Sequence, residues 1–596
     1  MRFSFRLDIA PSGLAALAAD HAERVPSAWE ARAARLWSPA PRIDLVDRGF
    51  IVGALFRREI PATRVTDLDP AERRRILDTD GAALLANYWG GYIALLIAED
   101  GSLSVLRDPS GMMPCYMQRM EGGAMLASDM TALATPGAAA VDFAALARMF
   151  AGIDVIGRRT GIAGVEELFP GERLTVTPSA IRIEQAWSPW DHVRPLAGLD
   201  FASAAQTLRA TLKDSIGAWS TCFDKILVGV SGGLDSSIVA AALGPRTPGL
   251  RCLTMVEPGT DGDEQRYAEA LVGKLGVRLD APIYDLGAVD VTQPVLPNLP
   301  LPFALHFFHA IEAEHRRLGD PVDAYFSGNG GDDIFCALRS AVPLADRLLA
   351  RGLRPGLIRT ARDLADLTGS GMAAVAGKAW ERVRRRKAGH RVRRDLSGLG
   401  AIGRAAAMDD GDRHPWLSAP PRALPGKAAH VAMLARAQKS IELYPRSNAP
   451  PQIVPLLSQP IVELCLSIPT WYWVRGGRDR AVARAAFDGL LPELILERRT
   501  KGSPSGFIRR VFDAQGEAAI ATLRVGRLVE AGLLDPDWLD RAGEGLWQDD
   551  GRDHRILTFA AAEAWVRWWE EGPYPSGSFP LASQRGAAAP ILSQSG

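Results

Sequence analysis

An apolar run at residues 226–230 (ILVGV) passes directly into the segment SGGLDSS, and an apolar helical pattern follows at residues 236–243. A strand that enters a glycine turn and then a helix is the opening unit of a parallel sheet with helical crossovers. The alternation continues, with strands expected at 251–256, near Pro282 and at 323–326, and helices expected at 204–219 and 263–275. This part of the α/β chain is therefore predicted to be a doubly wound parallel sheet.

The glycine turn has the composition of an anion-binding loop. Two glycines allow the backbone to approach a ligand, hydroxyls donate hydrogen bonds, and the amides of the next helix point at the anion. Asp235 adds a carboxylate, which suits a Mg²⁺ ion that bridges phosphates. The alternative is an ordinary turn in which Asp235 or Ser236 caps the helix. The candidate cofactor-binding residues of this loop are Val230, Ser231, Gly232, Gly233, Asp235 and Ser236.

A second glycine turn, SGNGGDD at residues 327–333, follows the strand expected at 323–326. Taken alone, its adjacent carboxylates are also compatible with a structural turn. A parallel sheet, however, brings both loops to the same carboxyl edge. The two loops are therefore predicted to face one ligand.

The first 180 residues have a different texture. Short β-like runs at 49–56, 91–97, 103–107 and 172–176 are separated by Gly and Pro, which predicts a layered α+β domain. A Trp- and Pro-rich stretch at 187–198 is the predicted linker. Helices are predicted to dominate 345–425 and 428–569, and the last twenty or so residues to be disordered.

Composition excludes several classes of protein. The 596 residues carry 69 Lys+Arg and 69 Asp+Glu, so no overall charge recruits nucleic acid or an anionic membrane. Five scattered cysteines without a CxxC argue against a disulfide scaffold and a structural zinc site. There is no signal-peptide core and no apolar run of about eighteen residues. The predicted location is cytoplasmic, with no nucleic-acid or membrane partner.

Together the two loops resemble the synthetase domain of the asparagine synthetase family, in the ATP pyrophosphatase superfamily, where SGGLDSS and SGxGxD adjoin an ATP site. The resemblance implies ATP and Mg²⁺ as cofactors. It implies that Ser327 and Gly328 face the nucleotide and that Asp235 and Asp332 hold the metal and pyrophosphate. Met255 matches the position that packs on adenine.

The resemblance covers most of the chain. GGYIAL, RDPSGMMPCY (107–116) and LASDM match the family's glutaminase-like, Ntn-hydrolase-type domain, and residues 161–175 resemble the segment that closes it. Residues 455–463 and 491–506 resemble the C-terminal helical region, and Asp263 and Glu264 match an acidic pair. The implied organisation is a degenerate glutaminase-like domain (1–185), an ATP-binding synthetase core (200–345), a helical basic insertion (346–425), a helical C-terminal part (426–575) and a disordered tail (576–596).

Two departures bear on the nucleophile. Glutamine-hydrolysing relatives carry cysteine as residue 2, whereas this chain has Arg2 and its nearest cysteine is Cys115. Without a thiol beside the α-amine we expect no glutaminase activity. Asparagine-forming relatives place a glutamate at Asn329, and an amide cannot serve as a general base. A β-lactam-forming relative has tyrosine there, so the position follows the nucleophile.

A peptide α-amine, with a pKa of about 7.7–8.0, is partly neutral near pH 7 and needs less help from a base than ammonium does. His306 and His309 are alternative bases, or ordinary packing residues. Lys501 matches a lysine that stabilises developing negative charge, although a solvated basic turn is the other reading. Lys501, Asn329 and Asp235 form the predicted catalytic set. Arg478 and Arg484 are candidates to support phosphates.

A third departure is the absence of the usual acidic and basic pair before PLLSQPIVE (455–463), which, with WGGYIAL, resembles the lasso peptide cyclases. The resemblance implies an AMP-forming ligase that adenylates an Asp or Glu side chain of a precursor peptide and joins it to the peptide's N-terminal amine. Its implied partners are a leader-peptide-binding protein and a leader protease. The alternatives are an asparagine synthase-like amidotransferase using ammonia or a small amine, and a non-catalytic nucleotide-binding scaffold. The basic run at 382–394 is a solvated helix face or a docking site for an acidic peptide.

Overall fold

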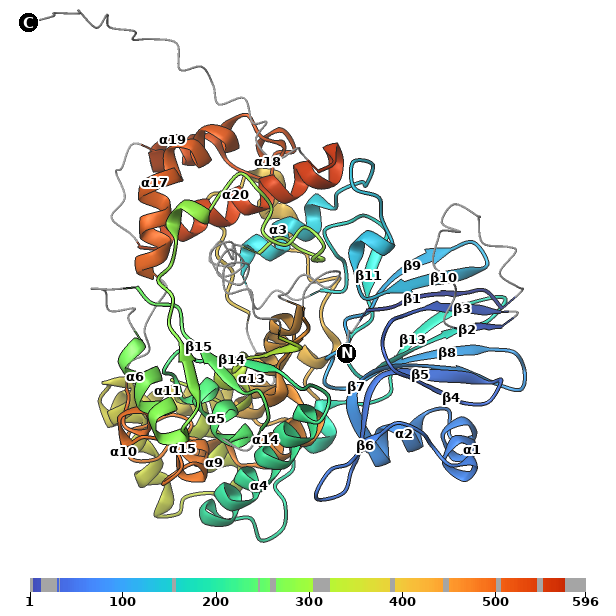
Figure 1. Cartoon of the computed structure of the whole chain (residues 1–596). Coiled ribbons are helices and arrows are strands. Elements are labelled where there is room, and N and C mark those ends of the chain that lie inside the picture. The colour runs from blue at the N-terminus through green and yellow to red at the C-terminus, as the bar shows by residue number, and fades with distance from the viewer. Residues whose placement is uncertain are drawn as a thin grey trace, which may run out of the picture.

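The computed structural model describes residues 4–11, 29–31, 33–152, 157–244, 247–257, 264–303, 322–385, 392–442, 450–499, 505–543 and 550–573. Within these ranges the chain forms two antiparallel sheets near its N-terminus, a parallel sheet in its middle and helices around both (Figure 1). The mixed α/β fold and the parallel sheet that the sequence predicts are confirmed.

The N-terminal part is built from two stacked antiparallel sheets (Figure 1). The first has the strand order β11 (Val165–Glu167), β9 (Tyr116–Met120), β10 (Gly123–Ala127), β1 (Arg6–Ile9), β3 (Ala34–Trp37) and β2 (Trp29–Ala31). The second has the order β13 (Ile181–Gln185), β12 (Glu172–Val176), β8 (Leu103–Arg107), β7 (Tyr88–Ile97), β5 (Gly49–Arg57) and β4 (Arg42–Asp44), and β6 (Arg64–Val65) pairs with β5.

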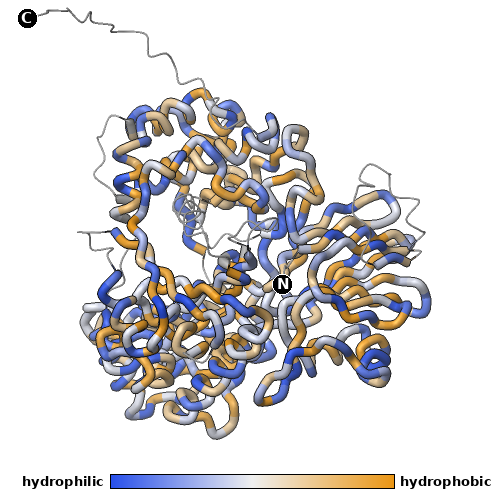
Figure 2. The backbone as a smooth tube through the Cα atoms, in the orientation of Figure 1, coloured by the Kyte–Doolittle hydropathy of each residue, from blue (hydrophilic) through white to orange (hydrophobic). Residues whose placement is uncertain are grey.

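The long strand β7 shows why these layers form. Its sequence YWGGYIALLI is buried at every position except the last, and its neighbour β5 is nearly as apolar. A strand buried on both sides needs a cover on each face. The other sheet covers one, and α2 (Ala82–Asn87), beside α1 (Pro70–Asp78), lies against β7 on the same side of the molecule as β6 (Figure 1). Figure 2 shows the hydrophobic stretches gathered in these strands.

The parallel sheet has the order β16 (Arg278–Asp280), β15 (Arg251–Leu253), β14 (Ile226–Gly229), β17 (Ala324–Phe326) and β18 (Gln452–Ile453). Helices α5 (Leu234–Leu243) and α6 (Gln265–Leu275) connect the first three strands in chain order, and α4 (Phe201–Ser220) precedes them. Ile226, Leu227 and Val228 are all buried, so both faces of the sheet are covered. The strands are shorter than predicted: β14 ends at Gly229, β15 at Leu253, and β16 before Pro282.

Helices make up most of the remaining described chain. A small hydrophobic cluster joins α9–α11, and a second cluster joins α3 to α17 and α20. The predominance of helix after residue 345 is confirmed. The helices are α3 (Phe143–Ala151), α8 (Gly331–Ile334), α9 (Val342–Arg351), α10 (Gly356–Thr368), α11 (Met372–Arg384), α12 (Ala401–Ala407), α13 (Pro425–Ala437), α14 (Gln459–Ser467), α15 (Ala481–Ala486), α16 (Glu493–Leu496), α17 (Ser505–Arg524), α18 (Arg527–Glu530), α19 (Pro536–Gly543) and α20 (Asp550–Glu571).

One continuous core joins the two antiparallel sheets, here called the N-terminal layers, to the parallel sheet. Phe56 lies 4.6 Å from Trp89 and 5.1 Å from Trp219 of α4, measured between ring centroids. The stretch predicted as a linker is packed, since Trp187 is 7% exposed and its indole Nε1 donates to Glu463 of α14 at 3.0 Å. The two parts therefore share their stability. Among the helices described, none has the length and apolar character that a bilayer span requires.

Candidate active site

Both glycine loops lie at one point of the parallel sheet. Strand β14 pairs with β15 on one side and with β17 on the other, and Val228 stands opposite Phe326. The chain order reverses direction here, and ligands of open α/β sheets bind in the crevice at such a point. The predicted juxtaposition of the two loops is present in the structure.

The first loop is held by a hydrogen bond between its own residues and leads directly into α5. The backbone N–H of Val230 donates to Leu253 O (2.8 Å), and that of Ser231 donates to Ser236 Oγ (3.2 Å). Gly232 has a φ of +60°, and a Cβ placed on it would lie 2.4 Å from Tyr267 Cβ. Gly233 precedes α5, whose first turn carries Asp235 and no basic side chain. The helix thus begins directly at the end of the loop, as the sequence predicts.

The second loop is held directly against the first. A Cβ on Gly328 would lie 2.4 Å from Ser236 N, and a Cβ on Gly331 would lie 2.3 Å from Asp235 Cβ. These glycines therefore allow one loop to pack on the other, a role that the sequence does not predict. Ser327 Oγ accepts from the backbone N–H of the exposed Asn329 (3.0 Å).

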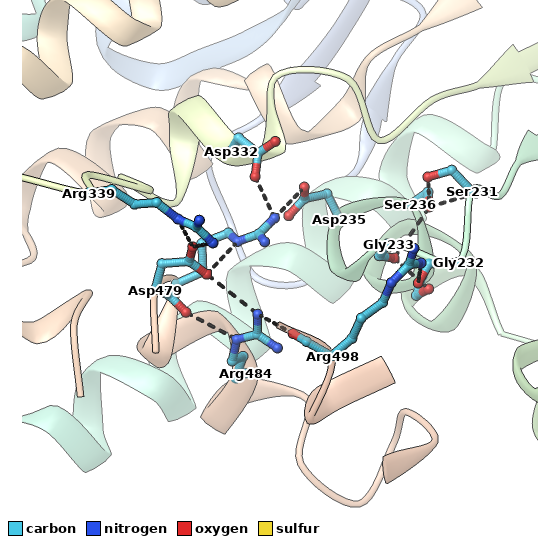
Figure 3. A network of polar contacts seen from close by, with 12 residues as sticks. Ser231, Gly232, Gly233, Asp235, Ser236, Asp332, Arg339, Asp479, Arg484 and Arg498 are labelled. Atoms are coloured by element: carbon cyan, nitrogen blue, oxygen red, sulfur yellow. Dashed lines mark hydrogen bonds and ion pairs between the residues drawn. The ribbon is translucent and has the colours of Figure 1, made fainter. Parts of the chain in front are cut away.

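The carboxylates of the two loops converge on one cation. Arg480 Nη1 lies 2.9 Å from Asp235 Oδ2 and 2.5 Å from Asp332 Oδ1, and Figure 3 shows the two carboxylates pointing toward the same place. The side chains of Asp235 and Arg480 are 8% and 12% exposed, whereas that of Asp332 is 45% exposed. Arg480 has a φ of +52° at the residue preceding α15.

Asp479 gathers the neighbouring arginines. Its carboxylate lies 3.3 Å from Arg480 and 3.4 Å from both Arg339 and Arg484 (Figure 3). Burial opposes ionisation of Asp479, but Arg480, Arg484 and Arg339 outweigh it and hold its pKa below the ordinary value. The pKa of Arg484 is lowered by burial and by the nearby charge of Arg480, which Asp479 only partly offsets. Asp479 is thus shared among three arginines.

A cavity of about 470 Å³ opens beside these groups. Six of its lining residues are arginines and two are aspartates, so it suits a multiply charged anion such as a phosphate chain. Both glycine loops contribute to its wall. The lining residues are Gly233, Leu234, Asp332, Ala337, Arg339, Met433, Arg436, Asp479, Arg480, Arg484, Ile495, Arg498 and Arg499.

Some of these residues are predicted by the sequence and others are not. Gly233, Asp332 and Arg484 were candidates, and all three line the cavity. Arg480 and Asp479 were missed, because nothing in the segment GGRDRAVAR links it to loops far away in sequence. Arg498 was also missed; it donates to Gly232 O (3.0 Å) and to Glu264 Oε1 (2.8 Å).

Other candidates lie outside the cavity wall or outside the described residues. Met255 is half-buried just beyond β15, and Arg478 forms an ion pair with Glu497 instead of lining the cavity. Lys501, Asp263, His306 and His309 fall outside the described residues, so their predicted roles stay predictions.

The candidate metal ligands fit the ion that the sequence implies. Within the described ranges no group of three or more His, Cys, Asp or Glu side chains is arranged to hold a metal by itself. Mg²⁺, however, is commonly bound by one or two carboxylates together with substrate phosphates. Asp235 and Asp332 already share a cationic partner in Arg480. Their donor set therefore suits Mg²⁺ bound jointly with phosphates.

The N-terminal layers hold Cys115, the cysteine nearest the chain start. It is fully buried, and burial raises the pKa of its thiol to about 12. A thiol that stays protonated at neutral pH is a poor nucleophile.

Comparisons with known proteins identify one family. The family model described as asparagine synthase matches residues 207–567, more than half of the chain. No curated protein matches. A solved structure of the allosteric regulatory enzyme of purine biosynthesis is 13% identical, with a TM-score of 0.18, and the match covers 49% of this chain and 76% of that one. Glutamine phosphoribosylpyrophosphate amidotransferase from B. subtilis, complexed with ADP and GMP, is 12% identical with the same TM-score, covering 56% and 71%. Likeness at this TM-score carries no argument about the fold.

Proposed function

Because this chain belongs to the asparagine synthase family, a family of ATP-dependent amide ligases and amidotransferases, we propose that it is a lasso peptide macrolactam synthetase. In this proposal the enzyme activates an Asp or Glu side chain of a precursor peptide with ATP and releases AMP and pyrophosphate. The peptide's own N-terminal amine then attacks the activated acyl group and closes an isopeptide ring.

One observation carries the ATP-dependent part of the proposal. Asp235 and Asp332, from two loops at the switch point of the sheet, meet at Arg480 on the wall of an arginine-lined cavity. Carboxylates for a metal and arginines for phosphates are the two requirements of a Mg·ATP site. Asp235 and Asp332 are the residues that would hold Mg²⁺. The bound ion would neutralise charge on the phosphates.

The arginines of the cavity are the residues that would bind the phosphates. If Asp235 and Asp332 held Mg²⁺, the guanidinium of Arg480 could turn to a phosphate, and its contact with Asp479 would keep it beside the cavity. Arg484 and Arg498 are fixed by carbonyl contacts, to Leu496 O at 2.7 Å and to Gly232 O at 3.0 Å, so their charges are preorganised at the cavity. Arg484 and Arg498 would thus stabilise departing pyrophosphate from positions that they already hold.

The choice of a peptide amine as nucleophile rests on the sequence and on Cys115. Residue 2 is Arg2, Cys115 is buried with a raised pKa, and Asn329 supplies no base beside the second loop. An α-amine, already partly neutral near pH 7, requires the least from such a site. Holding the amine and the acyl group of one peptide together would then be the enzyme's main task.

The test is a reaction of the purified chain with Mg·ATP and a candidate precursor peptide, followed by intact-mass analysis. The proposal predicts loss of one water from the peptide together with AMP. Matched controls are the same peptide with its N-terminus acetylated and with its acceptor Asp or Glu changed to the amide; both should remain unchanged. AMP formed with aspartate and ammonia instead would return the chain to asparagine synthesis. No turnover with any substrate, alongside measurable ATP binding, would favour the nucleotide-binding scaffold.

A further inference from the structure

A buried chain of charges crosses from the N-terminal layers to the parallel-sheet part. Arg107, at the end of β8, has Nη1 3.0 Å from Glu167 Oε1, and Lys439 Nζ is 2.5 Å from Glu167 Oε2. The side chains of Arg107, Glu167 and Lys439 are 2%, 5% and 16% exposed. Glu167 belongs to β11 of the first sheet, whereas Lys439 lies just beyond α13. One carboxylate therefore ties the two parts together.

Close packing accompanies this charge contact. Gly111 follows Arg107 in a turn with φ +68°, and a Cβ placed on it would lie 2.7 Å from Gln438 Oε1 and 2.6 Å from Pro170 Cγ. Arg107 fixes the same turn by donating to Gly111 O (3.1 Å) and Met113 O (2.9 Å). The end of α13 is thus seated on the N-terminal layers by both shape and charge.

The other side of α13 holds the second glycine loop. His430 Nε2 lies 3.0 Å from Ile334 O, and Arg436 forms an ion pair with Asp333. Both partners belong to α8, which has only four residues. So short a helix has too few internal hydrogen bonds to be stable alone, so its position depends on its neighbours. Asp332, one of the two carboxylates that meet Arg480, is in the same turn.

We propose that the N-terminal layers position the second glycine loop, with Glu167 holding Lys439 and thereby α13 against α8. This gives a role to a domain in which Arg2 stands where glutamine-hydrolysing relatives have cysteine. Glu167 is a positioning residue, since it acts on Asp332 only through α13. The inference deepens the proposed function, because the loop it positions is the proposed Mg·ATP loop.

The energetic basis is the cost of removing the carboxylate that lies between two buried cations. Removing the Glu167 carboxylate would leave Arg107 and Lys439 as two neighbouring cations that are mostly withdrawn from water. Burial disfavours the charged form of Glu167, but Lys439 and Arg107 together hold its pKa at about 2. A neutral side chain at this position would remove the ion pair that joins Lys439, just beyond α13, to β11.

The experiment compares two interface carboxylates in the full chain. Glu167→Gln keeps the size of the side chain and removes its charge. Glu463→Gln is the matched control: Glu463 makes a bidentate ion pair with Arg58 of the N-terminal layers (2.7 and 2.8 Å), but it belongs to α14 rather than α13. The readout is the hydrogen-exchange rate of the amides at 331–337, measured without ligand under native conditions.

We expect Glu167→Gln to accelerate exchange at 331–337 by about tenfold more than at β14 and β15, beyond any acceleration that a loss of global stability causes throughout the chain, and we expect Glu463→Gln to leave this ratio unchanged. A ratio that Glu167→Gln leaves at the wild-type value, or that both variants raise equally, would overturn the proposal. If Glu167→Gln fails to fold, Lys439→Met serves instead, because it removes the tie from the α13 side; unchanged exchange at 331–337 in that variant would also overturn it.

A second readout separates this inference from the proposed function. If the wild-type chain forms AMP, Glu167→Gln should raise the KM for Mg·ATP more than it lowers kcat, whereas Glu463→Gln should change neither. Local acceleration in a chain that never forms AMP would support the positioning role and contradict the ligase. AMP formation by the wild type, with exchange at 331–337 unaltered in Glu167→Gln, would support the ligase and contradict the positioning role.

Discussion

The N-terminal layers and the edge of the parallel sheet both contain buried charged side chains, but they balance those charges in different ways. In the layers, Arg107 is matched by Glu167 and by the carbonyl oxygens of Gly111 and Met113. At the carboxyl ends of the central strands of the parallel sheet, six arginines line one cavity together with two aspartates. In the layers the charged groups are packed against one another and against carbonyl oxygens, whereas at the carboxyl edge they surround a cavity that a charged ligand can enter.

This difference distinguishes a structural ion pair from a site. Buried ion pairs contribute little net stability but are costly to break, so a balanced pair fixes one arrangement of the chain. An unbalanced cluster is tolerated where a counter-ion binds. Charge removal in the layers should therefore affect folding first, and charge removal at the edge should affect chemistry first.

Asp235→Asn should give the largest change. The variant keeps the shape of the loop and loses one of two charges that would hold the metal, so AMP formation should fall by about 10⁴-fold. Measured unfolding free energy should change little, because Arg480 retains Asp332 and Asp479 as partners. Asp280→Asn, which alters a buried carboxylate paired with Arg251 in the same sheet, is the control and should keep its turnover. Equal losses of activity in the two variants would break the comparison.

Glu167→Ala should destabilise the fold by about 3–5 kcal/mol, the usual cost of removing one partner from a buried pair. Denaturant unfolding measures this. The pKa of Glu167 is lowered from 4.5 to about 2 in the folded chain, where Lys439 and Arg107 outweigh the effect of burial. Its stabilisation should therefore be complete above about pH 4.5 and be lost as the pH falls toward about 2. A variant whose stability loss is as large at pH 2 as at pH 7 would contradict this assignment.

Arg480→Ala should have opposite effects on the binding of Mg²⁺ and on the binding of pyrophosphate. Without the guanidinium, Asp235 and Asp332 lose a competing cation, so Mg²⁺ alone should bind more tightly than to the wild type. Pyrophosphate should bind more weakly, and AMP formation should fall by about 10²-fold. Calorimetric titration with each ion separates the effects. Arg478→Ala, two residues away and paired with Glu497, is the control. Weaker binding of both ions in Arg480→Ala would show that Arg480 only supports the loop.

Cys115→Ala should have the smallest effect. Deleting a buried sulfur costs about 1–2 kcal/mol of stability and should leave AMP formation unchanged. Neither the wild type nor the variant should release glutamate from glutamine, measured by coupled glutamate detection. Glutamine hydrolysis that disappears in Cys115→Ala would place catalysis in the layers and end the contrast between the two regions.

The sequence predicts a structural feature well when the residues that form the feature are consecutive in the chain. The first loop is encoded in consecutive residues, since the apolar strand, the glycines and the helix carrying Asp235 adjoin one another. Its strand, turn and helix are present in the structure. The strand β18, of only two residues, was missed because it forms only where Tyr325 and Phe326 offer a pairing edge. The boundaries of the domains and the role of Lys501 stay predictions.

The arginines of the cavity could not be found in this way. Arg480 is 245 residues from Asp235, and Arg498 is 266 residues from Gly232. Their contacts exist only after the C-terminal helices have packed against the parallel sheet, so no short pattern announces them. The same holds for Glu167 and Lys439, 272 residues apart. Ion pairs between residues far apart in the sequence can be identified only from the tertiary structure.

The most direct test of the central claim is the fate of the acceptor oxygen. A precursor peptide whose Asp or Glu carboxylate carries heavy oxygen is incubated with the enzyme and Mg·ATP, and the nucleotide products are analysed by mass. We expect AMP that contains one heavy oxygen, together with unlabelled pyrophosphate, because in the proposed reaction the carboxylate attacks the α-phosphorus at the site formed by Asp235 and Asp332. ADP with labelled phosphate, or AMP without the label, would contradict it.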